Sequence, residues 1–335
     1  MTLHIERDVP LAPFTTIGIG GPARFFIHVT SVDELREALA WAAGHRLFIL
    51  GGGSNLLIPD EGFDGVVIRM DLRGIDEKDG VVKVAAGEPW DAFVEYAVNK
   101  DLAGIECLSG IPGLTGATPI QNVGAYGQDV SETIDRVEAL DRTTGELIEF
   151  TNEQCRFGYR ASLFKNIEKD RYVVVSVAFR LRPGGEPTVR YPELQKYLGE
   201  ERDLRRVREA VIAIRKRKGM VLDPNDPDTR SDGSFFMNPI ITAAEYEAFA
   251  VRAPEAPHYP ASDGTVKLSA AWLIEHAGFH KGFVHRNVGL SSKHTLAVIN
   301  RGGGTAAEVR ELVAMVQDGV RAAFAVDIHP EPVFL

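Results

Sequence analysis

The sequence predicts an α+β protein with more than one packed region. At 335 residues the chain is too long for a single hydrophobic core of ordinary size. Short β-rich apolar runs and segments with helical spacing of apolar residues both occur along it. No internal repeat or low-complexity tract is visible, which excludes solenoid and propeller architectures.

The first part of the chain predicts short strands and helices that lead into glycine-rich loops. Residues 24–29 are β-rich, and Ser31 and Glu34 form a capping-box pattern that opens a helix ending near Gly44. Residues 47–50 predict a buried strand. Further strands are expected at 66–68 and 81–84, and a helix from Pro89 to about residue 100. Residues 104–127 are dense in Gly and Pro with few charges, so we expect this loop to be covered.

The second part continues the mixed pattern. A hairpin is expected at residues 137–140 and 147–150, a strand at 172–181, and a helix through Leu204, Val207, Val211 and Ile214. That helix ends in the basic run 215–218, which predicts a solvated helix end. A domain boundary is placed near residue 205. Helices at 243–251 and 268–277, a strand at 296–299, a long helix around residues 309–320 and an extended 326–335 complete the prediction.

Composition limits the class of function. The chain has 37 basic and 47 acidic residues and a net charge of -10, which opposes nucleic-acid or membrane binding through bulk electrostatics. Its two cysteines, Cys107 and Cys155, form no metal or disulfide pattern, so we expect core thiols, a reducing compartment and no metal. Residues 1–13 lack signal-peptide features and no stretch could span a bilayer, so a cytoplasmic location is expected.

A glycine run follows the strand predicted at residues 47–50. Successive amides of Gly51, Gly52 and Gly53 can form a concave anion-binding nest, and Ser54 and Asn55 add polar groups. The run fits neither a Walker loop nor a dinucleotide-binding fingerprint, and alone it also fits a plain turn. A second glycine-rich segment spans residues 110–127. Two such loops around one cavity would suit a long phosphate-bearing ligand.

Five blocks of residues carry a family resemblance along essentially the whole chain. They are Gly51 to Leu57, Ser109 to Gly127, Cys155 to Arg160, Gly233 to Phe236 with Asn238 and Pro239, and Pro330 to Pro332. In this order they resemble the UDP-N-acetylenolpyruvoylglucosamine reductase family, flavoenzymes of peptidoglycan precursor synthesis. Tyr259 and its loop resemble the substrate-covering loop of the longer subclass.

The resemblance implies a vanillyl-alcohol-oxidase (PCMH)-type fold. Residues 1–205 would form the FAD-binding region, with a core at about 15–185 and two α+β lobes split near residue 60. Residues 206–325 would form a smaller α+β substrate-binding domain, and 326–335 a C-terminal strand carrying Glu331. The family implies non-covalent FAD, NADPH as co-substrate, a UDP-sugar substrate and a monomer. No obvious histidine or cysteine at the glycine loops suits covalent flavin attachment.

The resemblance also assigns the flavin-binding residues. Thr16 to Gly21 match an early glycine segment near the flavin. The remaining cofactor contacts are expected at Gly51, Gly52, Gly53, Ser54, Asn55, Gly110, Ile111, Pro112, Gly113, Gly116, Ala117, Gln121, Asn122, Gly124, Ala125, Tyr126 and Gly127.

Three residues match the family's catalytic positions. Arg160 would stabilise the enolate-like intermediate, Ser234 would donate the proton, and Glu331 would help polarise or protonate it. Without the resemblance they would be interpreted as a surface salt-bridge residue, a turn residue and a solvated carboxylate. The positions resembling substrate contacts are Tyr191, Lys218, Asn238, Tyr259, Lys281 and His294.

Two alternatives remain at this stage. The first is an FAD-dependent oxidase or dehydrogenase acting on an alcohol or sugar lactone, because a shared fold does not settle the reaction. The second is a non-catalytic nucleotide-binding module that regulates a partner. An absorption spectrum of the purified protein separates the flavoenzymes from the binding module.

Overall fold

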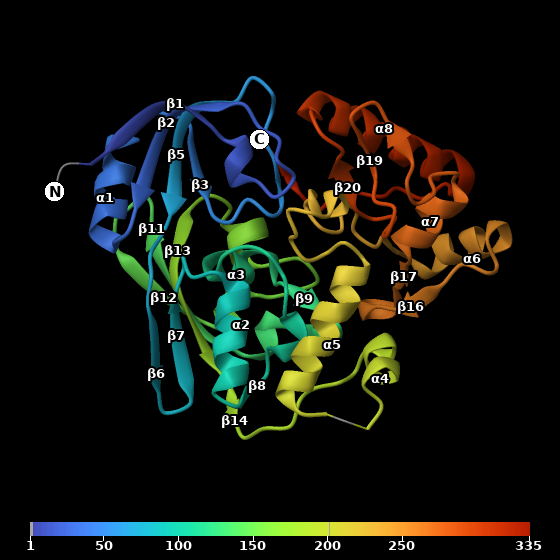
Figure 1. The fold of residues 1–335 in the computed structure, drawn as a ribbon, viewed down its shortest axis with the longest axis horizontal. Coiled ribbons are helices and arrows are strands. Elements are labelled where there is room, and N and C mark those ends of the chain that lie inside the picture. Colours follow the sequence, from blue (N-terminus) through green and yellow to red (C-terminus); the bar gives the residue numbers. More distant parts are fainter. Residues whose placement is uncertain (1–2, 201) are drawn as a thin grey trace. The chain divides into compact units, whose positions relative to one another are not determined.

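The computed structural model describes residues 3–200 and 202–335 and divides the chain into two compact units (Figure 1). Unit 1 comprises Met1–Val9, Ala23–Gly52 and Asp64–Arg217. Unit 2 comprises Pro10–Pro22, Gly53–Phe63 and Lys218–Leu335. The chain therefore passes between the units several times, and each unit is described by itself.

Unit 1 contains a four-stranded sheet with the strand order β1-β2-β5-β3. Its strands are β1 (Ile5–Pro10), β2 (Pro22–Val29), β5 (Phe63–Met70) and β3 (Leu47–Leu50). Strands β3 and β5 are parallel, with Leu47 opposite Val66. Helix α1 (Val32–Trp41) packs Leu35 and Ala38 into the cluster that holds Ile27 and Ile68, as its apolar spacing predicts.

A second sheet of unit 1 is antiparallel, with the order β12-β11-β13-β7-β6. Its strands are β12 (Leu147–Thr151), β11 (Ile134–Asp141), β13 (Tyr172–Arg180), β7 (Val81–Ala85) and β6 (Ile75–Lys78). The shorter elements are β8 (Leu102–Ala103), α3 (Thr118–Gln121), β9 (Gly124–Ala125), β10 (Gln128–Asp129) and β14 (Arg182–Pro183). The hairpin and the strand expected at 172–181 are confirmed.

Three further helices complete unit 1: α2 (Trp90–Asn99), α4 (Pro192–Leu198) and α5 (Leu204–Arg217). Figure 1 shows α2 beside α5, where Asp91 and Arg208 form an ion pair. Much of the glycine-rich loop at 104–127 is buried, including Glu106, Ser109 and Thr115, so the expectation of a covered loop is confirmed.

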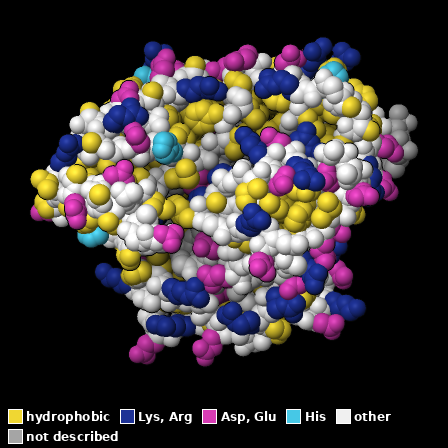
Figure 2. Space-filling view, turned by 180° about the vertical axis from the view of Figure 1, so that it is seen from behind, with side chains coloured by type: hydrophobic (Ala, Val, Ile, Leu, Met, Phe, Trp, Pro, Cys, Tyr) yellow, Lys and Arg dark blue, Asp and Glu magenta, His cyan; other side chains and the backbone are white. Residues whose placement is uncertain are grey.

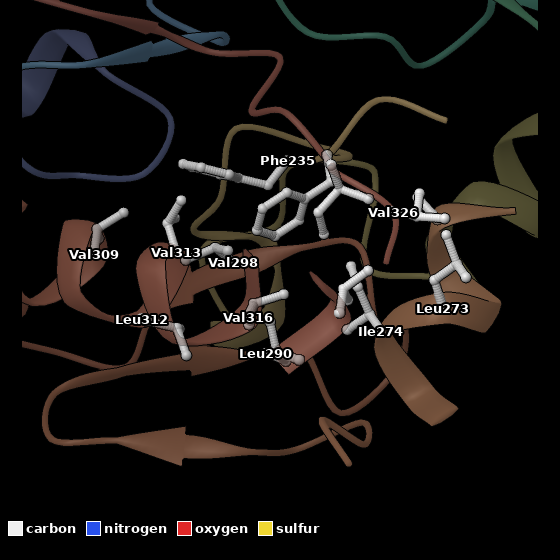
Figure 3. Close-up of a cluster of buried hydrophobic side chains, with 14 of the residues drawn as sticks. Phe235, Leu273, Ile274, Leu290, Val298, Val309, Leu312, Val313, Val316 and Val326 are labelled. Carbon is white, nitrogen blue, oxygen red and sulfur yellow. The ribbon is translucent and has the colours of Figure 1, made fainter. Parts of the chain in front are cut away.

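Unit 2 is built around the long helix α8 (Ala306–Phe324). Its other elements are β4 (Leu56–Leu57), β15 (Ile240–Ile241), α6 (Ala243–Arg252), β16 (His258–Pro260), β17 (Val266–Leu268), α7 (Ala270–His276), β18 (Val284–His285), β19 (Val288–Leu290), β20 (Val298–Asn300) and β21 (Val333–Phe334). The helical face of Leu312 and Val316 packs with Phe235 and Leu290 into one apolar cluster (Figure 3). Phe235 is fully buried and therefore anchors the segment that follows Gly233.

Some local expectations were wrong. Ser31 caps α1 by accepting from the Glu34 amide, but the Glu34 carboxylate accepts from Thr30 rather than from Ser31, so the capping box is incomplete. The two compact units meet in sequence after Arg217, because the inner face of α5 packs with Cys107 and Leu194 of unit 1, and the domain boundary near residue 205 stays a prediction. The basic run was expected to be solvated, and Lys216 and Arg217 are exposed, but Arg215 differs because burial lowers its pKa. Among the elements that sequence reasoning missed are β1, whose centre is charged, β6, and the seven-residue helix α4.

The surface carries charges of both signs. Figure 2 shows Lys and Arg side chains interspersed with Asp and Glu side chains on the face that it displays. Within residues 3–200 and 202–335, no helix combines the length and the apolar character needed to cross a bilayer.

Candidate active site

The first glycine run leaves β3 and crosses from one unit to the other. Gly51 and Gly52 belong to unit 1, whereas Gly53, Ser54 and Asn55 belong to unit 2. A Cβ on Gly52 would lie 2.5 Å from the Cα of Gly113, so within unit 1 the two glycine-rich segments touch through their backbones. A Cβ on Gly51 would meet nothing within 4 Å, which leaves room beside that backbone for a ligand.

Helix α2 holds the second glycine-rich segment. The Asp91 carboxylate accepts from the Gly110 amide at 2.6 Å, and the Trp90 amide donates to the Gly113 carbonyl at 3.0 Å. Arg208 donates both Nη groups to Asp91, at 2.6 and 3.0 Å. Burial raises the pKa of Asp91, but the Arg208 guanidinium and the Gly110 amide outweigh it and leave the pKa below its usual value. A charged pair therefore supports this segment.

Arg160 is oriented by backbone carbonyls of the same segment. Its Nη1 donates to the carbonyl of Asn122 at 3.3 Å and its Nη2 to the carbonyl of Gly124 at 3.0 Å. Arg160 has a φ of 52°, in the left-handed region that non-glycine residues seldom adopt. Nearby, Lys165 donates to the Gln121 side chain at 2.8 Å and to the Arg160 carbonyl at 3.0 Å. These contacts place a fixed cationic group beside the residues 121–127.

In unit 2 the end of the first glycine run lies against the C-terminal segment. The Thr16 amide donates to the Gly53 carbonyl at 2.9 Å, and the Asn55 side chain donates to the Glu331 carbonyl at 3.4 Å. Val333 donates in turn to the Asn55 carbonyl at 3.0 Å. Gly53 is buried, and its amide donates to no acceptor within the described part of the chain. An unpaired buried amide of this kind fits an anionic ligand group such as a pyrophosphate.

The same C-terminal segment pairs with the segment that carries Ser234. Glu331 donates its amide to the Phe235 carbonyl at 2.8 Å, and Phe236 and Pro330 form an antiparallel bridge. The Phe235 amide donates to the Leu296 carbonyl at 2.7 Å, so the loop that contains Leu296 also holds this segment in place. Two predicted catalytic positions, nearly a hundred residues apart in sequence, therefore lie together in unit 2.

Asp232 lies two residues before Ser234 and is buried, with no cationic partner among the described residues. Only 4% of it is exposed. Its Oδ1 lies 3.2 Å from the Thr16 hydroxyl. Burial raises the pKa of Asp232 to about 8 and is the dominant effect on this group. This carboxyl therefore differs from Asp91 in its state of protonation near neutral pH.

The residues predicted to contact substrate are divided between the units. Tyr191, in unit 1, is 40% exposed and packs edge-on against Tyr126 with ring centroids 5.3 Å apart. In unit 2, Lys218 follows α5, Asn238 precedes β15, Tyr259 lies on β16, Lys281 follows α7, and His294 precedes β20. The Asn238 side-chain oxygen accepts from the Ala270 amide at 2.9 Å, so it also supports the start of α7.

Each unit thus carries part of the predicted site. Unit 1 brings together Gly51, Gly52, the residues 110–127 and Arg160, and unit 2 brings together Gly53 to Asn55, Ser234 and Glu331. Sequence reasoning missed Asp91, Arg208 and Asp232. An acidic residue in the first turn of α2 was a usable signal for Asp91, whereas nothing in the sequence marks Asp232 as buried.

Two protein-family models match the chain. The model of an FAD binding domain matches residues 23–151, and the model described as "UDP-N-acetylenolpyruvoylglucosamine reductase, C-terminal domain" matches residues 224–335. The chain is 48% identical to the UDP-N-acetylenolpyruvoylglucosamine reductase of Thermobifida fusca, covering 100% of this chain and 99% of that protein. It is 50% identical to that of Saccharopolyspora erythraea, over 97% of this chain and 94% of the relative.

A solved structure shows the same fold. The crystal structure of UDP-N-acetylenolpyruvylglucosamine reductase from Thermus caldophilus aligns with a TM-score of 0.71 and 26% identity over 99% of both chains. The predicted α+β fold class with an FAD-binding region is confirmed. The chain belongs to the UDP-N-acetylenolpyruvoylglucosamine reductase family and is an FAD-dependent oxidoreductase.

Proposed function

We propose that the chain reduces UDP-N-acetylglucosamine enolpyruvate to UDP-N-acetylmuramate with electrons from NADPH, a step of peptidoglycan precursor synthesis. The observation that carries the proposal is the pairing in unit 2 of the Ser234 segment with the Glu331 segment, beside Asn55. Motifs far apart in the sequence converge there on one place, as a catalytic site requires. Family membership supports the same reaction and opposes the non-catalytic binding module.

The glycine runs would hold the cofactor without covalent attachment. The open space beside Gly51 and the Gly53 amide, which is unpaired within the described chain, support a pyrophosphate contact. The chemistry that bound FAD supplies is a hydride for the enolpyruvyl methylene carbon. Within unit 1, the residues 110–127, held by Asp91 and Trp90, would contact the cofactor beside Gly51.

Arg160 would stabilise the negative charge that develops on the substrate. A guanidinium stays protonated at any working pH and binds a carboxylate through two parallel hydrogen bonds. The Asn122 and Gly124 carbonyls orient this group in advance, so little reorganisation is needed when the charge appears. The left-handed backbone at Arg160 is consistent with a position held for function.

Ser234 would donate the proton to the carbon that bears the substrate carboxylate, with Glu331 assisting. Both residues are half-buried, and backbone pairing fixes their segments relative to each other. A serine hydroxyl is a weak acid, so this role depends on the charge of the surrounding groups. Lys218 would contact the diphosphate, and Tyr191, Asn238, Tyr259, Lys281 and His294 the remainder of the nucleotide-sugar.

We also propose a cytoplasmic monomer. A nucleotide-sugar substrate and NADPH are available in that compartment, and two buried free cysteines are compatible with it.

The test is anaerobic mixing of the purified protein with NADPH and then with the enolpyruvyl UDP-sugar. Flavin absorbance should bleach with NADPH and return only when the UDP-sugar is added. Ser234→Ala should spare the bleaching and slow the return by about 10²-fold or more, the range typical of a lost general acid.

Ser269→Ala is the matched control. Ser269 lies in the same unit and caps α7 by accepting from the Trp272 amide, so its loss should lower stability by about 1 kcal/mol and leave the two rates in their usual ratio. No substrate-dependent return in the unaltered protein would reject the reductase, and equal slowing of both rates in Ser234→Ala would reject the role of Ser234.

A further inference from the structure

The turn that carries Ser234 is tied to the N-terminal segment by one threonine. Within unit 2, the Thr16 hydroxyl lies 2.7 Å from the Ser231 carbonyl oxygen and 3.2 Å from Asp232 Oδ1. The Thr16 amide donates to Gly53 at 2.9 Å. Thr16 therefore connects the first glycine run to the residues directly before Ser234.

The number of protons that Thr16, Ser231 and Asp232 can share decides whether Asp232 is protonated. A threonine hydroxyl has one proton to donate, and the Ser231 carbonyl can only accept. The shorter contact, to Ser231, takes the Thr16 proton. The 3.2 Å contact is then a hydrogen bond only if Asp232 carries a proton and donates it to the Thr16 oxygen. An ionised Asp232 would instead direct its oxygen at a lone pair of Thr16.

The surroundings of Asp232 favour the neutral form as well. Within the described residues, its Oδ2 has no hydrogen-bond partner, and the Leu56 amide lowers the pKa of the carboxyl by less than burial raises it. The groups that act on Asp232 from the packed segments are the Thr16 hydroxyl and this amide, and no charged or other titratable side chain of the described chain acts on it. A buried carboxylate without a cation would cost several kcal/mol, so the group keeps its proton instead.

We propose that Asp232 is a neutral carboxylic acid in the folded protein, that it donates its proton to the Thr16 hydroxyl oxygen, and that this hydrogen bond positions the turn bearing Ser234. Asp232 is a positioning residue, since it acts through the turn and not on substrate. The positioning of Ser234 for proton transfer rests on the proposed function, whereas the protonation of Asp232 does not. Loss of the proton at alkaline pH would remove the hydrogen bond and loosen the turn.

The first experiment measures protonation through stability. The asparagine side chain of the Asp232→Asn variant can donate to Thr16 but cannot titrate. The folded state binds the Asp232 proton more tightly than the unfolded state, so stability from this proton is complete below the unfolded pKa and lost as pH rises through about 8. The ratio of the unfolding constants of the unaltered protein and Asp232→Asn should grow about tenfold per pH unit between about pH 5 and 7.

Thr229→Val is the matched control, because Thr229 is buried in the same unit, cannot titrate, and has its hydroxyl 2.8 Å from the carbonyl oxygens of Asp223 and Asp226. A ratio that widens with pH for Asp232→Asn and stays level for Thr229→Val supports the proposal. A level ratio for Asp232→Asn, or the same slope for both variants, overturns it. Substrate plays no part in this measurement, so it stands even if the proposed reaction fails.

The second experiment reads the positioning of Ser234. Asp232→Ala should slow the substrate-dependent return of flavin absorbance more than bleaching by NADPH, and Asp232→Asn should recover part of that loss. The unaltered protein should lose the return rate above about pH 8, and Asp232→Asn should not. Equal slowing of both rates, or no recovery with asparagine, would reject the positioning role.

Discussion

Each unit supports its part of the site with an aspartate, but the Asp91 carboxyl is ionised near neutral pH and the Asp232 carboxyl is neutral. In unit 1, Asp91 accepts from Gly110 and from both Nη groups of Arg208, and its pKa lies below the usual value. In unit 2, Asp232 faces a hydroxyl and an amide, and its pKa is raised to about 8. Burial disfavours the charge at both positions, so the presence of a guanidinium decides which carboxyl stays ionised.

The difference predicts opposite responses to pH. The stability that Asp91 contributes is present above its unfolded pKa and is lost as pH falls through its lower folded pKa. The stability that the Asp232 proton contributes is lost as pH rises through about 8. Acid should therefore weaken the support of residues 110–113, and alkali the support of the Ser234 turn.

The largest expected effect lies where the glycine run passes between the units. Gly53 has a φ of 58°, and a Cβ there would overlap the Phe14 carbonyl, so Gly53→Ala should destabilise the protein by about 3 kcal/mol. Gly51→Ala places its methyl group in open space and should change stability by about 0.5 kcal/mol or less while weakening FAD binding. Denaturant unfolding and FAD titration of the apoprotein measure both. Equal destabilisation by the two variants would contradict the division of the run into packed and open glycines.

The next largest loss of stability is expected when the ion pair between Arg208 and Asp91 of unit 1 is broken, and it should exceed the loss from breaking an ordinary surface pair. Arg208→Met should cost about 1–2 kcal/mol at pH 7, because Arg208 is only 11% exposed although Asp91 is 39% exposed. The loss should shrink in acid, as the pH falls through the lowered pKa of Asp91 and the carboxyl takes up a proton. Arg206→Met, which breaks an exposed pair with Glu209, is the control and should cost about 0.5 kcal/mol or less. A cost for Arg208→Met that does not depend on pH would show that packing, and not charge, supports Gly110.

A smaller effect is expected at Thr16. Thr16→Val removes the contacts to Ser231 and Asp232 and should cost about 1 kcal/mol, measured by urea unfolding at pH 7. Combined with Asp232→Ala, which removes the carboxyl that contacts Thr16, in a double-mutant cycle, it should reveal coupling between the two side chains. Additive costs would mean that Asp232 does not bond to Thr16.

The smallest effect is expected from thiol reagents, which would act on the two cysteines of unit 1. Cys107 and Cys155 are fully buried, and burial raises the pKa of Cys155 to about 12. Thiol reagents should therefore leave the native protein unmodified. Labelling in increasing denaturant then reports the opening of unit 1 separately from unit 2. Rapid labelling without denaturant would contradict the burial of these thiols.

Local pattern was sufficient for most of the elements. Apolar spacing predicted the positions of α1, α2 and α8, and β-rich runs predicted those of β3, β7 and β13. Each of these elements buries apolar side chains, and their spacing can be recognised in the sequence. Strand β1 was missed because charged residues interrupt its apolar pattern, and α4 was missed because its seven residues are too few to show a helical period. The order of five motif blocks was sufficient to recognise the reductase family.

The sequence by itself therefore determined the α+β class, most helices and most of the longer strands, the FAD-binding region and the family. Only the tertiary structure decided that Gly51 and Gly53 differ, that the Glu331 segment pairs with the Ser234 segment, and that Arg215 is not solvated. It alone decided that Asp91 has an arginine partner, whereas the described surroundings of Asp232 hold none. The physical reason is that burial and charge depend on neighbours distant in the chain, whereas periodicity depends on neighbours along it.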